Sequence, residues 1–159
     1  LLEQIVLGQI FVINRLEGRS RIRLLFLVSV IWTIAWLLIG FSVSLDPTAT
    51  FILAAVGIGI FALGEMIWSS VGPTLTNELA PEHLRGRYNS VDGLVWVFAG
   101  AAGPAISGIM LQFELVFAWI ALIVVGQVFG GLLALRLKRV LTPSQDGLLD
   151  DQTLAAAEK

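Results

Sequence analysis

Basic residues divide this chain into long apolar stretches. All but one of its ten Lys and Arg residues fall into three short clusters: Arg15, Arg19, Arg21 and Arg23; Arg85 and Arg87; and Arg136, Lys138 and Arg139. Each gap between clusters is long enough for two membrane crossings and a turn, so the chain returns to the same side each time. Cytoplasmic loops are enriched in Lys and Arg, which predicts a cytoplasmic position for all three clusters and for the C-terminus.

The composition excludes several classes of protein. Hydrophobic residues make up 57% of the chain and charged residues only 14%, against about 45–50% and about 25% in soluble domains. A lipid bilayer is therefore the expected surrounding. The absence of cysteine removes thiolate metal sites, and no basic patch is interleaved with aromatic residues as nucleic-acid binding requires. With one histidine and no Gly-rich phosphate loop, we expect neither an enzyme nor a bound cofactor or metal.

The apolar runs predict an all-α membrane protein, a transmembrane helix bundle. Full spans are expected at 24–44, 49–72, 88–112 and 115–135, while residues 1–14 are too short for a crossing and fit the end of a truncated helix. Asp46 and Pro47 are suited to cap and open the second span. The polar composition of residues 141–159 predicts a cytoplasmic tail that is disordered or forms a weak surface helix.

Carboxylates inside the spans are candidates for function, because charge is costly in a membrane. Glu65 lies deep in the second span, where it could exchange a proton or bind substrate, or merely hydrogen-bond a neighbouring helix. Glu3 lies at membrane depth with the same two alternatives. Asp92, near the cytoplasmic surface, could pair with Arg87 or with a basic residue of the first cluster, in a structural or gating role. Helices with such groups should line an interior, which leaves the 24–44 and 115–135 spans outside.

The third span carries a stripe of small residues, Gly100, Gly103, Pro104 and Gly108. Small residues allow two helix backbones to approach closely, and a proline inside a helix removes a hydrogen bond and can bend it. The stripe therefore predicts either tight packing or a hinge used in a conformational change.

The segment from Glu78 to Tyr88 (ELAPEHLRGRY) resembles a loop of the major facilitator superfamily, and Gly103-Pro104 is similar to the Gly-Pro of the helix that follows it there. Residues 14–19 (NRLEGR) resemble a degenerate copy of the family's basic loop motif. The resemblance implies that residues 1–140 are part of a C-terminal transmembrane lobe, from the end of the eighth helix through the twelfth. It also implies that the eighth, tenth and eleventh helices line the cavity. The overall pattern is similar to drug–proton antiporters.

These observations favour secondary active transport of a small solute by alternating access, as proton-coupled efflux across the plasma membrane. Glu65 and Glu3 are the proton or substrate candidates, and the cytoplasmic gate candidates are Arg15, Arg19, Arg85, Arg87 and Asp92. The expected partners are the lipid bilayer, a small-molecule substrate and the remaining N-terminal part of the transporter. The alternative is a membrane scaffold, or an inactive transporter fragment, that uses the same helices for packing alone.

Overall fold

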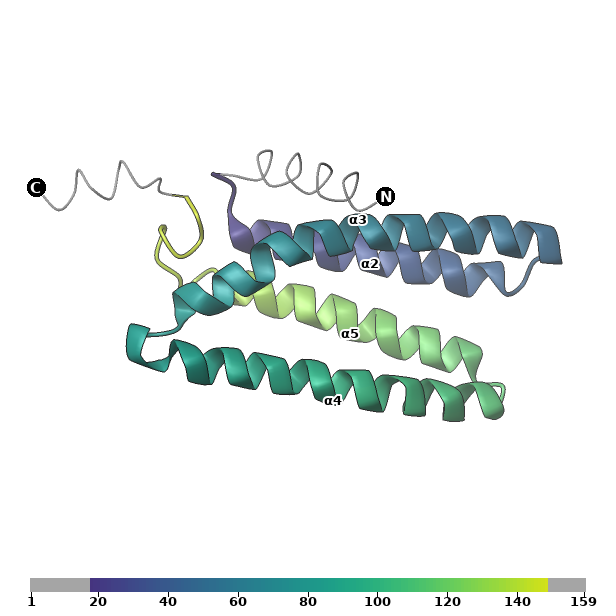
Figure 1. The fold of residues 1–159 in the computed structure, drawn as a ribbon. Helices are drawn as coiled ribbons and strands as arrows, with labels where there is room; N and C mark the ends of the chain where they lie inside the picture. The colour runs from purple at the N-terminus through teal and green to yellow at the C-terminus, as the bar shows by residue number, and fades with distance from the viewer. Residues whose placement is uncertain (1–17, 149–159) are drawn as a thin grey trace, which may run out of the picture.

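The computed structural model describes residues 18–148, and within that range the regular structure is entirely helical. The long helices are α2 (Arg21–Ser42), α3 (Pro47–Leu79), α4 (Arg85–Gln112) and α5 (Val116–Leu137), and a short 3₁₀ helix η1 (Glu82–Leu84) precedes α4. The four long helices run up and down side by side (Figure 1). All four are long and apolar enough to cross a membrane, which confirms the predicted transmembrane bundle.

Local sequence signals set where the helices begin. The Asp46 carboxylate accepts hydrogen bonds from the backbone N–H groups of Thr48 and Ala49, at 3.1 and 3.2 Å, and Pro47 opens α3. This is the predicted cap, because a proline at the first position forfeits only an N–H that has no partner in the helix. At the start of α2, the Ser20 hydroxyl accepts a hydrogen bond from the N–H of Arg23.

Helix α3 is longer than the predicted span, because it continues through Pro73 to Leu79. Its 33 residues extend about 50 Å at about 1.5 Å per residue, well beyond the roughly 30 Å of a bilayer core. The helix changes direction in its C-terminal third, the part that contains Pro73 (Figure 1). A proline bends a helix without ending it when the neighbouring turns stay paired. The polar residues at the end of α3 therefore belong to the helix and not to a loop.

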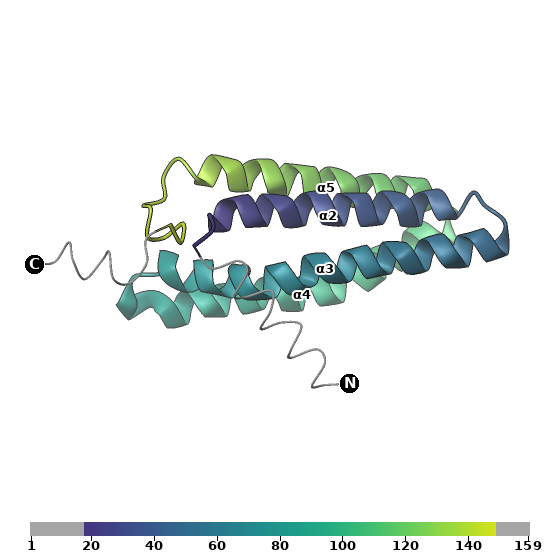
Figure 2. The ribbon, with the colours of Figure 1, turned by 90° about the horizontal axis from the view of Figure 1, so that it is seen from above.

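Helix α2 is the centre of the described bundle, with α3 on one side and α5 on the other (Figure 2). Glycines make these contacts close. A Cβ added at Gly57 would lie 3.1 Å from the Ala35 carbonyl oxygen, and one added at Gly131 would lie 2.5 Å from Ser29 Oγ. The Ser29 hydroxyl also donates a hydrogen bond to the Gln127 carbonyl across the α2–α5 contact. Shape and small residues bring these membrane helices together, as expected where lipid competes for every apolar surface.

Helix α4 has a very different environment. None of its residues is buried, and it makes no contact with α2 within residues 18–148. Its link to α3 includes a hydrogen bond from Asn89 Nδ2 to Asn77 Oδ1, 2.9 Å long, and a ring contact between Trp68 and Trp96 with centroids 6.4 Å apart. Large apolar side chains such as Phe98 are 75% exposed. The described residues therefore leave most of the surface of α4 uncovered.

The expected division of inner and outer helices stays a prediction, because it concerns the cavity of a complete transporter. Among the described residues, the charge-free α2 is the most buried of the four long helices. Charge content indicates which helix needs a polar environment, but it does not determine how many neighbours an apolar helix contacts. The predicted tail also differs in part: residues 141–148 form turns against the start of α2, and the rest of the tail, like residues 1–14, lies outside the described residues.

Candidate functional site

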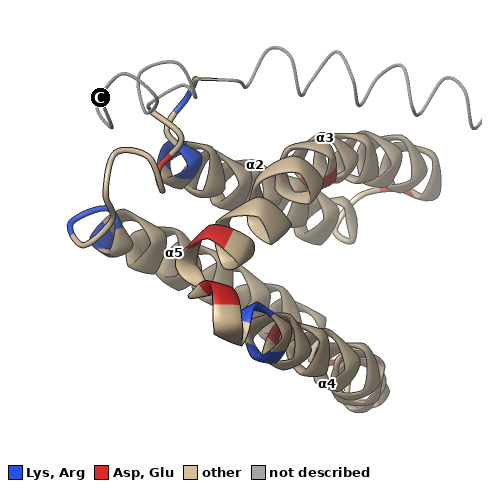
Figure 3. Ribbon diagram, turned by 60° about the vertical axis from the view of Figure 1, so that its left-hand side comes forward, with Lys and Arg blue, Asp and Glu red and all other residues tan. Residues whose placement is uncertain are grey.

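One end of the bundle gathers the basic residues, and we call it the basic end. It contains the first turns of α2 and α4 and the last turns of α3 and α5, with Lys and Arg in front in Figure 3. Arg19, Arg85 and Arg87 all lie here with exposed side chains. Arg15 and Glu3 fall outside the described residues. The described members of the three clusters are therefore brought to one side, although they lie far apart along the chain.

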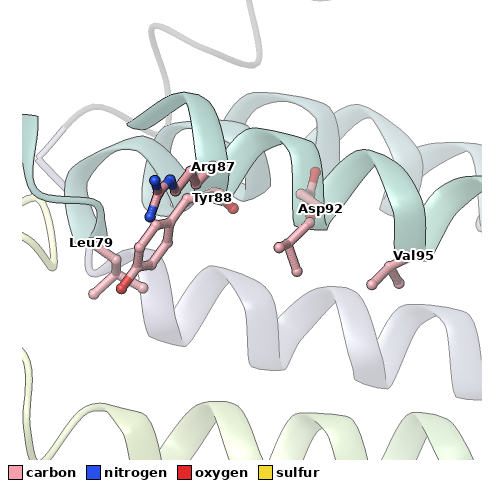
Figure 4. Close-up of a pocket in the computed structure, with 7 residues that line it drawn as sticks. Leu79, Arg87, Tyr88, Asp92 and Val95 are labelled. Atoms are coloured by element: carbon pink, nitrogen blue, oxygen red, sulfur yellow. The ribbon is translucent and has the colours of Figure 1, made fainter. Parts of the chain in front are cut away.

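A pocket of about 480 Å³ opens at the basic end between α3 and α4, lined by Thr76, Leu79, Arg87, Tyr88, Val91, Asp92 and Val95. The Tyr88 ring lies beside Leu79, while Asp92 and Val95 follow further along α4 (Figure 4). The walls are mainly apolar, and Arg87 and Asp92 bring opposite charges to them. Two of the predicted gate residues therefore share one pocket.

The predicted pair between Asp92 and Arg87 does not form a salt bridge in the described part of the chain. The ion pair found there joins Arg21 of α2 to Glu78 of α3. Arg87 and Asp92 are five residues apart, whereas side chains three or four apart face each other on a helix. Within residues 18–148 no group of three or more His, Asp or Glu side chains is placed to hold a metal ion.

Glu65 lies near the middle of α3, about 27 Å along the helix from Pro47. Its side chain is exposed, and no residue among 18–148 forms a hydrogen bond or an ion pair with it. The adjacent Gly64 lies in the α2–α3 contact, where a Cβ would collide with the Trp32 indole. Glu65 is about 100° further round the helix, on a surface that the described residues leave exposed.

The small-residue stripe of α4 makes no close contact with the described part of the chain. A Cβ added at Gly100, Gly103 or Gly108 would meet nothing within 4 Å. Pro104, inside α4, is exposed. The glycines that do pack tightly are in the other helices, so the role of the stripe stays a prediction.

Sequence reasoning missed a polar cluster at the basic end that centres on Arg21. Its guanidinium Nη1 donates to Glu78 of α3 and to the Gln145 carbonyl oxygen, the latter at 2.9 Å. Asp146, only 3% exposed, accepts hydrogen bonds from the Ser20 hydroxyl and the Ile22 N–H. The cluster joins α2, α3 and the segment after α5. The polar composition of the tail does not predict this cluster, although Glu78 lies in the segment that resembles a loop of the major facilitator superfamily.

Four apolar helices, crossing back and forth with their basic residues at one end, define a multi-pass integral membrane protein. The chain is 31% identical over 103 residues to the uncharacterized MFS-type transporter YhjO of Bacillus subtilis (strain 168). That similarity covers 65% of this chain and 24% of the relative, and it supports the major facilitator superfamily at the level of family. No family model matches the chain. No solved structure matches it either.

Proposed function

We propose that this chain forms part of a secondary transporter of the major facilitator superfamily, which moves a small solute by alternating access. The observation that carries the proposal is the similarity to an MFS-type transporter over 103 residues, together with four helices fit to cross a membrane. Transporters of this kind are built from repeated helical units around a central site. The chain spans about a quarter of the relative it matches, so further helices complete the site.

The uncovered surface of α4 is the proposed contact with that remaining, N-terminal part of the transporter. Val97 and Phe98 are 71% and 75% exposed, and glycines nearby would allow another helix to approach closely. The basic end is proposed to face the cytoplasm, in line with the enrichment of Lys and Arg in cytoplasmic loops. Arg19, Arg85, Arg87 and Asp92 would then lie at the inner gate of a transporter in the plasma membrane.

Proton coupling is assigned to Glu65. A carboxylate in the middle of a span faces protein or a water-filled cavity, because lipid does not solvate it. Glu65 is exposed and has no hydrogen-bond or ion-pair partner among residues 18–148. It is therefore free to face the cavity that further helices would enclose. In efflux, solute leaving the cell would be exchanged for a proton entering through this group.

Inverted membrane vesicles containing the full-length transporter test this assignment. After respiration acidifies the vesicle interior, a panel of hydrophobic cationic dyes such as ethidium is added, and a pH-sensitive fluorophore reports proton release. We expect release with the native protein, loss of at least tenfold with Glu65→Gln, and partial activity with Glu65→Asp. Glu114→Gln, at the exposed turn between α4 and α5, is the matched control and should behave as native. Proton-driven transport that survives Glu65→Gln would show that Glu65 has no such role.

A further inference from the structure

We propose that residues 141–148 form a C-terminal clasp in which Asp146 is a positioning residue for Arg21, holding it in its ion pair with Glu78. The clasp rests on contacts in this chain alone. Its consequence for transport rests on the function proposed above, because a pair that joins α2 to α3 would hold the basic end of the lobe in one arrangement during the transport cycle.

Asp146 fixes the start of α2 through both of its carboxylate oxygens. Oδ1 accepts the backbone N–H of Ile22 at 2.9 Å, and Oδ2 accepts the Ser20 hydroxyl at 2.7 Å. The Asp146 carbonyl oxygen also accepts the N–H of Arg21 at 2.9 Å. A residue distant in sequence therefore satisfies N–H groups that a helix start leaves without partners. Asp146 and Ser20 are 3% and 4% exposed, so water does not compete strongly for these bonds.

The neighbours of Asp146 hold the Arg21 side chain. The Gln145 carbonyl accepts from Arg21 Nη1 at 2.9 Å, and the same nitrogen donates to Glu78. Gly147 lies beneath the side chain: a Cβ there would be 3.2 Å from Arg21 Nε, and its φ of +75° suits glycine. The clasp is itself ordered by internal bonds, including Asp146 N–H to the Thr142 carbonyl at 3.1 Å and Leu148 N–H to the Pro143 carbonyl at 2.9 Å.

The position of Arg21 matters because an exposed ion pair contributes little to stability by itself. The Arg21 and Glu78 side chains are 21% and 35% exposed, and ordering two long side chains opposes the attraction between them. When the clasp has already fixed the Arg21 backbone and one guanidinium nitrogen, much of that ordering cost has been met. The clasp therefore makes the pair effective and ties the ends of α2, α3 and α5 into one unit.

A double-mutant cycle in the full-length transporter tests the clasp, with Tm in detergent and the maximal rate of dye-driven proton release as separate measurements. Asp146→Ala and Glu78→Gln should each lower Tm by a few degrees and the rate several-fold. The double variant should be no worse than the more damaging single variant, because both changes remove the same interaction. Asp146→Asn should keep most of the native Tm, since asparagine also caps helices well.

A matched pair of glycine variants keeps the test decisive if Asp146→Ala fails to fold. Gly147→Ala and Gly18→Ala share the cost of a positive φ, +75° and +72°, but only at Gly147 would the new Cβ meet Arg21. Gly147→Ala should therefore lower Tm more. Three outcomes would each overturn the clasp. The Tm losses of Asp146→Ala and Glu78→Gln could add fully in the double variant, or the two glycine variants could lower Tm equally. The third outcome is an Asp146→Asn variant as damaged as Asp146→Ala. The Tm values could follow the expected cycle while the native protein shows no dye-driven proton release. That result would retain the clasp and reject the proposed transport function.

Discussion

Helices α2 and α4 are both long and apolar enough to cross a membrane, yet they differ in almost every contact. Helix α2 packs against α3 and α5 and buries seven residues, among them Ile22, Val28 and Ala35. Helix α4 buries none, although it is the helix with the stripe of small residues. The difference shows that small residues mark where a helix can be approached, whereas contact also requires a partner of complementary shape.

The comparison of α2 with α4 also divides the bundle into two parts that are held by different contacts. The α2, α3 and α5 helices are joined by close glycine contacts, by the Ser29–Gln127 hydrogen bond and by the clasp at Arg21. Helix α4 is joined to them by the pocket-lining end of α3, by Asn89 and by Trp96. We therefore interpret α2, α3 and α5 as the fixed part of the proposed lobe and α4 as the part that is free to meet other helices or to move.

The largest expected loss of stability comes from enlarging a glycine in the packed part. With Gly64→Leu, the new Cβ would lie 2.6 Å from Trp32 Cδ1, and Trp32 is held by its bond to the Phe61 carbonyl. Overpacking of this kind costs about 1–3 kcal/mol, measured as the free energy of unfolding in detergent micelles. Gly59→Leu is the control in the same helix, because nothing lies within 4 Å of its Cβ. Equal losses in the two variants would mean that the α2–α3 contact contributes little.

A smaller effect is expected from removing one hydrogen-bond donor in the same contact. The Trp32 indole N–H donates to the Phe61 carbonyl at 3.2 Å, and its ring stacks on Phe61 with centroids 5.3 Å apart. Trp32→Phe keeps an aromatic ring but loses this bond, which is worth about 1 kcal/mol. Trp96→Phe, in exposed α4, should cost less. Unfolding followed by circular dichroism measures both variants, and a greater loss at Trp96 would contradict the proposed division of the bundle.

The sequence was sufficient to predict the membrane class, the four membrane-spanning helices within residues 18–148 and the helix start at Asp46, because apolar length and capping are local properties. It did not identify which glycines pack against a neighbouring helix. Gly57, Gly64 and Gly131 do so because of the shape of the helix that faces them, which the sequence does not give. It also missed the order at Asp146, because a polar tail predicts disorder unless its bonds to a distant helix start are known. The Asp92–Arg87 pair, one of two alternatives for Asp92, is not a salt bridge within residues 18–148, and side chains five residues apart do not face each other on a helix.

The smallest expected effect on stability is also the one that best separates packing from motion. Gly103 in α4 has nothing within 4 Å of its Cβ among residues 18–148, so Gly103→Leu should change the free energy of unfolding of this chain by no more than about 0.5 kcal/mol, as at other open positions. In the full-length transporter the same leucine would stand where another helix is proposed to approach or slide. We therefore expect at least a tenfold loss of dye-driven proton release, while Gly59→Leu, at an equally open position in α3, leaves the rate near native. Native transport rates with Gly103→Leu would mean that the stripe is neither a hinge nor a sliding surface, and α4 would then be an uncovered helix that faces lipid.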